Sequence, residues 1–171
     1  MSLIASFWTL DAGHRSGLVD AYKPIQRQHT KRRWFFVSSS VIETVYPWFE
    51  YMNTNAREEA SFQFSGAVMA DLELMLPEGS SLFSLALPES DKLAEYAEAS
   101  VALVDEAGAH TAETRLTSFK LTEDNVIKFY ESDQRPLEDP ADAAAILAGH
   151  AQLVSWCRAV TPGRLGLLMI G

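Results

Sequence analysis

Apolar side chains recur along the chain with two different spacings, which predicts a protein that mixes strands and helices. Short apolar or aromatic runs of strand length occupy residues 2–9, 33–37 (RWFFV), 82–87 (LFSLAL) and 164–170. Helical spacing or capping residues predict helices over about 12–22, from near Val41 past Pro47, and over about 64–76, 90–107 and 139–160.

Capping and helix-breaking residues set several of these boundaries. Pro47 must kink or restart its helix, because a proline inside a helix removes a hydrogen bond. Ser90 is expected to cap one helix and Gly108 to end it. Asp139 as the cap and Pro140 in the first helical position predict the start of the last helix.

Residues 114–131 allow two interpretations. The segment 126–131 (VIKFYE) holds two β-branched and two aromatic residues, which favours a strand. It would then form a hairpin with residues 114–121 through Thr122–Asn125. The alternative is a short helix capped by Thr122. The hairpin is the preferred prediction.

About five helices and five or six strands in mixed order predict an α+β fold, with the helices packed on a mixed or mainly antiparallel sheet. The length of 171 residues is that of one domain, so residues 1–171 are expected to form a single globular domain. The strands predicted at the two ends of the chain are expected to pair side by side.

The composition is that of a globular protein, with 47% hydrophobic residues. Cys157 is the only cysteine, so no internal disulfide can form, which favours a reducing compartment. The first residues lack the basic segment of a signal peptide, and no apolar run reaches the length of a membrane span. We therefore expect a soluble, cytoplasmic protein with no membrane contact.

The net charge of −9 is unevenly distributed along the chain. Residues 1–40 hold six basic and two acidic side chains, a net charge of +4, whereas residues 41–171 hold eight basic and 21 acidic ones, a net charge of −13. An acidic chain repels phosphates, which argues against nucleic acid as a partner. The acidic part fits a basic protein partner or serves solubility alone.

The common fingerprints of enzymes and metal sites are missing from the sequence. It contains no G-x-x-x-x-G-K-[ST], G-x-G-x-x-G or G-x-S-x-G motif, and no H-E-x-x-H or C-x-x-C. We therefore expect no cofactor, no metal and no catalytic residue of the usual kinds. An active site assembled from scattered residues is not excluded.

Aromatic residues are concentrated in one segment. Seven of the 18 aromatic residues lie between Trp34 and Tyr51, directly after the basic run at 31–33. This combination suits a cleft for a flat or anionic molecule. The candidate ligand-binding residues are Arg32, Arg33, Trp34, Tyr46, Trp48 and Tyr51. The alternative is an aromatic core strand and helix beside a solvated basic turn.

Adjacent aromatic residues on a helix cannot all face the core. Of Trp48, Phe49 and Tyr51, at least one ring is therefore expected near the surface.

Three other sets of reactive side chains are weaker candidates. His150 and Cys157 are two helical turns apart, about 10.5 Å, which is too far for a catalytic pair. Asp71 and Glu73 do not face each other on a helix. Two further carboxylates, Glu43 and Glu50, are expected to be exposed.

The leading hypothesis is an intracellular binding protein, for example an immunity-like or regulatory protein, whose acidic surface meets a basic protein partner. The alternative is a small-molecule-binding protein or enzyme that uses an aromatic and basic cleft around residues 31–51. Nucleic-acid binding through the basic run ranks third.

Overall fold

A computed structural model describes residues 3–33, 37–132 and 140–171. Its strands are β1 (Ala5–Asp11), β2 (Ile25–Arg33), β3 (Val37–Val45), β4 (Ala56–Glu58), β5 (Ser100–Asp105) and β6 (Arg164–Ile170). Its α-helices are α1 (Arg15–Tyr22), α2 (Trp48–Asn55), α3 (Gly66–Met75), α4 (Glu89–Ala97), α5 (Glu106–Ser118), α6 (Glu123–Ser132) and α7 (Pro140–Ala159). Two 3-10 turns are η1 (Ala12–His14) and η2 (Phe83–Leu85). The predicted α+β fold is confirmed.

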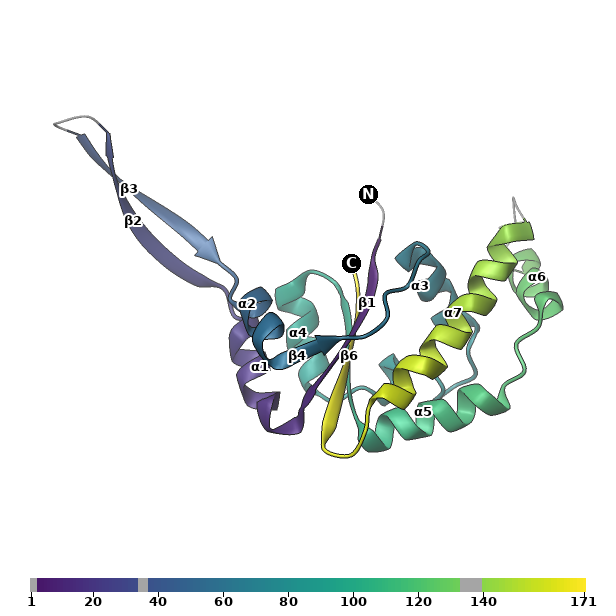
Figure 1. The fold of residues 1–171 in the computed structure, drawn as a ribbon. Coiled ribbons are helices and arrows are strands. Elements are labelled where there is room, and N and C mark those ends of the chain that lie inside the picture. Colours follow the sequence, from purple (N-terminus) through teal and green to yellow (C-terminus); the bar gives the residue numbers. More distant parts are fainter. Residues whose placement is uncertain (1–2, 34–36, 133–139) are drawn as a thin grey trace.

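A four-stranded antiparallel sheet in the order β4-β1-β6-β5 forms the centre of the fold. The two terminal strands pair over their whole length, from Ala5 opposite Ile170 to Asp11 opposite Arg164. The expected pairing of the chain ends is therefore confirmed, and Figure 1 shows β1 and β6 side by side.

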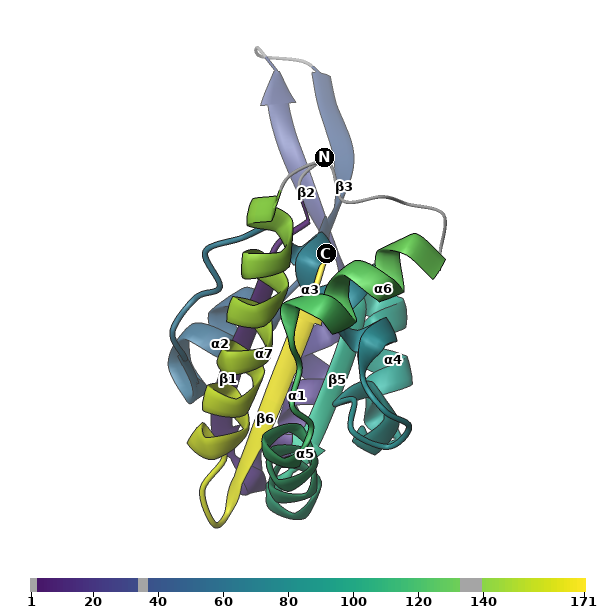
Figure 2. The same ribbon diagram turned by 90° about the vertical axis from the view of Figure 1, so that its right-hand side faces the viewer.

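Helices cover both faces of this sheet (Figures 1 and 2). Alternate strand residues point to opposite faces, so each strand contributes to two cores. The core beneath α3, α5, α6 and α7 receives Ala5, Phe7, Ala102, Val104, Leu168 and Ile170 from the strands. The core beneath α1, α2 and α4 receives Leu10, Val101, Leu103, Leu165 and Leu167.

Gly166 in β6 allows the end of α7 to approach the sheet closely. A Cβ atom at this position would lie 2.5 Å from Cζ of Phe7 and 2.7 Å from Cγ2 of Val160. Both neighbours are buried and cannot move away freely. Next to this contact, Phe7 stacks on Trp156 with ring centroids 5.4 Å apart.

Several predicted boundaries agree with the structure. The first helix, η1 followed by α1, begins after Asp11, whose Oδ1 accepts the backbone N–H of Gly13. The helix α3 begins after Ser65, and the last helix begins at Pro140 as predicted.

The helix predicted over 90–107 is wrong in its second half. It ends at Glu98, which adopts a left-handed conformation with φ of 51°, and β5 follows at once. A non-glycine residue gives no sequence signal for such an end. Ser90 is not the cap but lies buried in α4, where its Oγ accepts the backbone N–H of Leu103. Gly108 does not end a helix but lies inside α5.

The strand predicted over 82–87 is also wrong. Residues 83–85 form a 3-10 turn, which local serine hydrogen bonds favour. The Oγ of Ser81 accepts the N–H of Phe83, and Ser84 donates to the Ser81 carbonyl.

The preferred hairpin over 114–131 is wrong, and the helical alternative for 126–131 holds. The two segments belong to α5 and α6. Thr122 and Asn125 cap α6 reciprocally, since Oγ1 of Thr122 accepts the Asn125 N–H and Oδ1 of Asn125 accepts the Thr122 N–H. The side chain of Val126 is buried in the core and holds α6 against it.

The helix predicted from near Val41 is wrong, because residues 37–45 form strand β3 and α2 begins only after Pro47. The β-branched residues of VIETV outweigh the capping potential of the preceding serines. Of the buried strand predicted over 33–37, residues 34–36 lie outside the described residues. Arg33 ends β2 and Val37 begins β3.

The strands β2 and β3 form an antiparallel ribbon that projects from the molecule (Figure 1). We call these two strands the arm, and the other described elements the body. The arm pairs with no strand of the four-stranded sheet. No described arm residue belongs to either core.

Shortening the arm is expected to leave the body folded. In the arm-shortened variant, Asn-Gly replaces residues 28–42 and joins Arg27 to Glu43, which are register partners, through a two-residue turn. We expect the Tm to change by less than about 3 °C, since roughly 1 kcal/mol corresponds to a few degrees at this size. Thermal unfolding followed by circular dichroism measures it.

Phe7→Ala serves as the control, because it removes a fully buried ring and should cost about 3–5 kcal/mol. A loss of stability in the arm-shortened variant as large as that of Phe7→Ala would contradict the independence of the body from the arm.

Candidate functional site

The inner part of the arm, residues 25–28 and 42–44, is exposed on both of its faces. Side chains at odd and even positions of a strand point to opposite faces, so burial of one face would appear as an alternation. The side chains of residues 25–28 and 42–44 are instead all exposed, and Val45 is half-buried. Ile42, for example, is 65% exposed. Neither face of the described part of the ribbon is therefore packed against the body.

The arm carries most of the positive charge that the sequence places near the N-terminus. Its basic residues are Arg27, Lys31, Arg32 and Arg33, and Glu43 is its only acidic residue, which gives a net charge of +3. The rest of the chain holds ten basic and 22 acidic side chains, a net charge of −12. The net charge of +4 over residues 1–40 comes from these four basic residues of the arm, because Arg15 and Lys23 balance Asp11 and Asp20.

Aromatic residues of α2 form the base of the arm. Trp48 stacks on Tyr22 of α1 with ring centroids 5.5 Å apart. The hydroxyl of Tyr51 donates to the carbonyl of His14 at 2.9 Å. Desolvation raises the pKa of Tyr51. These contacts fix α2 on α1 and thereby anchor the point from which the arm projects.

Other rings at this base face solvent. Phe49 is 64% exposed and Tyr46 is 49% exposed. The prediction that at least one ring of Trp48, Phe49 and Tyr51 lies near the surface is confirmed.

The five predicted ligand-binding residues that the structure describes fall into two groups at opposite ends of the arm. Tyr46, Trp48 and Tyr51 lie at the base of the arm, whereas Arg32 and Arg33 lie at the far end of β2. Arg33 is eight residues from the start of β2, which corresponds to about 26 Å along a strand. Trp34 lies outside the described residues.

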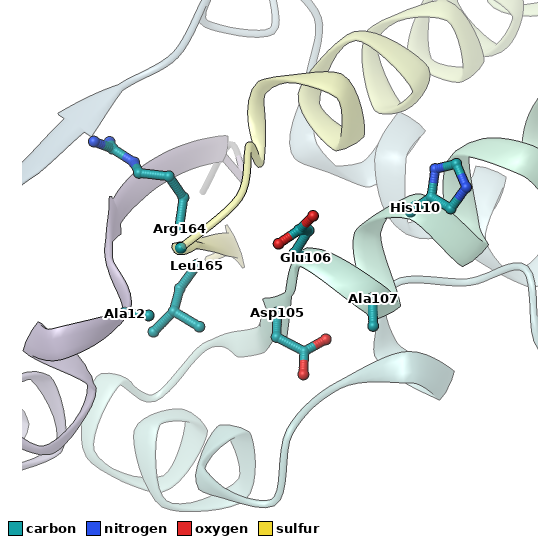
Figure 3. Close-up of a pocket in the computed structure, with 8 residues that line it drawn as sticks. Ala12, Asp105, Glu106, Ala107, His110, Arg164 and Leu165 are labelled. Carbon is teal, nitrogen blue, oxygen red and sulfur yellow. The ribbon is translucent and has the colours of Figure 1, made fainter.

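A pocket of about 440 Å³ opens at a different place, where β1 and β5 end and β6 begins. Its polar lining residues are Asp105, Glu106, His110 and Arg164. Figure 3 shows that these side chains do not converge, since Arg164 points away from both carboxylates.

Three of the four polar side chains at this pocket contact other parts of the fold. Asp105 caps α5 by accepting the N–H of Gly108 at 2.8 Å. Arg164 donates to Oγ1 of Thr9 at 2.8 Å. His110 lies 3.7 Å from Glu113, whose pKa is lowered chiefly by its hydrogen bond with Arg158. The arrangement offers no acid and base aimed at a common point.

Glu73 of α3, which the sequence offered only as a weak candidate beside Asp71, is a half-buried carboxylate. Its Oε2 accepts a hydrogen bond from Ser81, and the backbone N–H of Leu82 also bonds the carboxylate. Its Oε1 is buried without a hydrogen-bond partner. Desolvation therefore raises its pKa from 4.5 to about 7. Its neighbour Asp71 accepts a hydrogen bond from Tyr130 instead.

His150 and Cys157 on α7 have separate environments. Nε2 of His150 lies 3.1 Å from the carbonyl of Leu116, and desolvation lowers the pKa of this histidine. Burial raises the pKa of the Cys157 thiol to about 12, with smaller contributions from Glu113 and Glu73. A thiol of this kind is a poor nucleophile, because the thiolate is the reactive form.

No family model, curated protein or solved structure matches this chain. Within residues 3–33, 37–132 and 140–171, no three His, Cys, Asp or Glu side chains gather closely enough to hold a metal ion. A search of the same residues finds no helix of the length and hydropathy needed to cross a membrane. A functional proposal for this protein is therefore based on its own geometry and charge.

The raised pKa of Glu73 predicts that the stability of the protein depends on pH. The folded protein favours protonated Glu73, whereas the unfolded chain ionises it near pH 4.5, so this group costs stability as the pH rises from about 4.5 to about 7. The loss is roughly 1.4 kcal/mol per pKa unit, on the order of 3 kcal/mol in all. Glu73→Gln is expected to become more stable than the native protein across this window.

Chemical denaturation at a series of pH values from 4 to 8 measures this difference. Glu78→Gln, at an exposed position after the same helix, is the control and should follow the native curve. If Glu73→Gln also runs parallel to the native curve at every pH, the protonation of Glu73 in the folded state is refuted.

Proposed function

We propose that this protein is a non-enzymatic, cytoplasmic interaction protein whose acidic body binds a basic protein partner. The observation that carries the proposal is the separation of charge between the arm, at +3, and the rest of the chain, at −12. A surface field of one sign attracts partners of the opposite sign and accelerates their association. The lone cysteine, buried and reduced, is compatible with the cytoplasm.

The helix α4 is a densely acidic part of the body surface. Asp91 and Glu95 of this helix and Glu98 directly after it are exposed, and within the described part of the chain none of them forms an ion pair. Asp91 and Glu95 are one helical turn apart and lie on the same side of the helix. By contrast, Glu89 of the same helix forms a bidentate ion pair with Arg15, whose Nε and Nη2 lie 2.9 and 2.6 Å from the two carboxylate oxygens. The three exposed carboxylates support binding of a cationic surface.

The pocket and the buried groups support an enzyme less well. The pocket's Asp105 and Arg164 have structural partners, and the only cysteine is protonated in the core. A cleft formed by residues 31–51 would require the outer arm and α2 to meet, although about 26 Å of strand separate them.

A pull-down from cell extract tests the proposed function. The arm-shortened variant is the bait, so that whatever it retains must bind the body. We expect a protein that presents a basic surface to be retained at low salt and released as ionic strength screens the charges. Asp91→Asn with Glu95→Gln and Glu98→Gln should weaken retention roughly tenfold, because each exposed ion pair contributes about 0.2–1 kcal/mol.

Lys92→Gln on the same helix is the matched control. It makes the surface more acidic and should retain the partner at least as well. Retention that is insensitive to salt and to the three neutralising substitutions, or no retention at any salt concentration, would reject the proposal.

A further inference from the structure

The two strands of the arm pair only with each other and with no other strand of the described residues. A two-stranded ribbon in water is only marginally stable by itself, and its outer edges present unpaired backbone groups. In the described residues, β2 and β3 pair only with each other, and the exposed side chains of residues 25–28 and 42–44 show that no second layer covers them. The ribbon is therefore expected to gain stability by contacting another molecule.

The body of the same molecule cannot serve as that partner. The arm extends away from the body (Figure 1), and its basic residues 31–33 lie at the end of β2 that is far from α1. Eight residues of strand, about 26 Å, separate Arg33 from the start of the arm. Charges interact strongly only within about 10 Å at ordinary salt, so the body is out of reach of charges at this end of the arm.

A second copy of the chain offers a surface of the required sign. Outside the arm its chain carries a net charge of −12, against +3 for the arm. Exposed apolar side chains at the base of the arm would add a desolvated contact to this attraction: Ile25, Ile42, Tyr46 and Phe49. Contact between two arms is disfavoured instead, since both are basic.

We infer that the protein self-associates, with the arm of one copy docked on the acidic body of a second. This inference rests on the proposed function, because it identifies the basic partner of the body as the arm of another copy. Each molecule then contributes one donor arm and one acceptor body. A closed two-fold dimer satisfies both, which is the commonest arrangement of soluble oligomers.

Sedimentation velocity of the purified protein tests the inference. The native protein is expected to sediment faster as its concentration rises at low salt and to return to a monomer at about 0.5 M salt, where the Debye length is only several ångströms. The arm-reversed variant, Lys31→Glu with Arg32→Glu and Arg33→Glu, changes the arm from +3 to −3 and should remain a monomer. Ser38→Thr with Ser39→Thr and Ser40→Thr keeps the charge and should behave as the native protein does.

A mixing experiment identifies the surface that the arm contacts. A fluorescently labelled arm-shortened variant has an acceptor body but no donor arm. Unlabelled native protein should increase its sedimentation coefficient at low salt, and the arm-reversed variant should not. If native molecules associate with one another but leave the labelled variant unchanged, the contact joins two arms and the inference is wrong.

Three further results would overturn the inference. The first is a native protein that stays monomeric at all concentrations, and the second is association that is equal in the arm-reversed variant. The third is a monomer whose arm instead binds a labelled oligonucleotide at physiological salt. A monomer combined with a salt-sensitive protein retained from extract overturns the inference and leaves the proposed function intact.

Discussion

Seven residue pairs join β1 to β6, and both hydrophobic cores are built on the two sides of this ladder. The first and last strands of the chain thereby become the centre of the sheet. Phe7 and Leu168 point to one side of the ladder, and Leu10 and Leu165 point to the other. Every helix layer depends on this pairing, since it supplies the apolar surface on which the helices lie. Loss of the ladder would separate β4 from β5 and open both cores.

The arm stands outside this cooperative unit. It leaves the body after α1 and returns to it at α2, and the stacking of Trp48 on Tyr22 fixes these two helices to each other. The described residues of the arm lie outside both cores, so we expect the body to fold without it. The same arrangement carries basic residues away from the rest of an acidic chain. Our proposal that the arm serves association rather than stability rests on this separation.

Sequence patterns predicted the elements that local signals determine. Pro140 marks the start of α7, and the apolar run of residues 165–170 after Arg164 predicts β6 correctly. Sequence patterns gave wrong predictions where tertiary contacts determine the secondary structure. Residues 100–105 fit a helical stripe as well as a strand, and only pairing with β6 selects the strand. Similarly, the segment 126–131 has strand-forming residues but is held as a helix by its cap and by the burial of Val126.

The candidate site could be predicted only in part. The sequence identified the basic run and the aromatic cluster, and it placed some of the rings at the surface. It could not reveal that β2 pairs with β3. Arg33 and Trp48 are close in sequence, but this pairing places the length of a strand between them. The raised pKa of Glu73 likewise arises from burial of an oxygen without a partner, a consequence of packing that no spacing of residues encodes.

Hydrogen exchange of backbone amides tests most directly whether the arm is stabilised by association rather than by the body. In dilute solution, amides of β1 and β6 should exchange slowly, whereas those of β2 and β3 should exchange orders of magnitude faster. Raising the concentration at low salt should protect the arm without changing the body. Arm amides that are as protected as those of β1 in a dilute monomer would contradict this account.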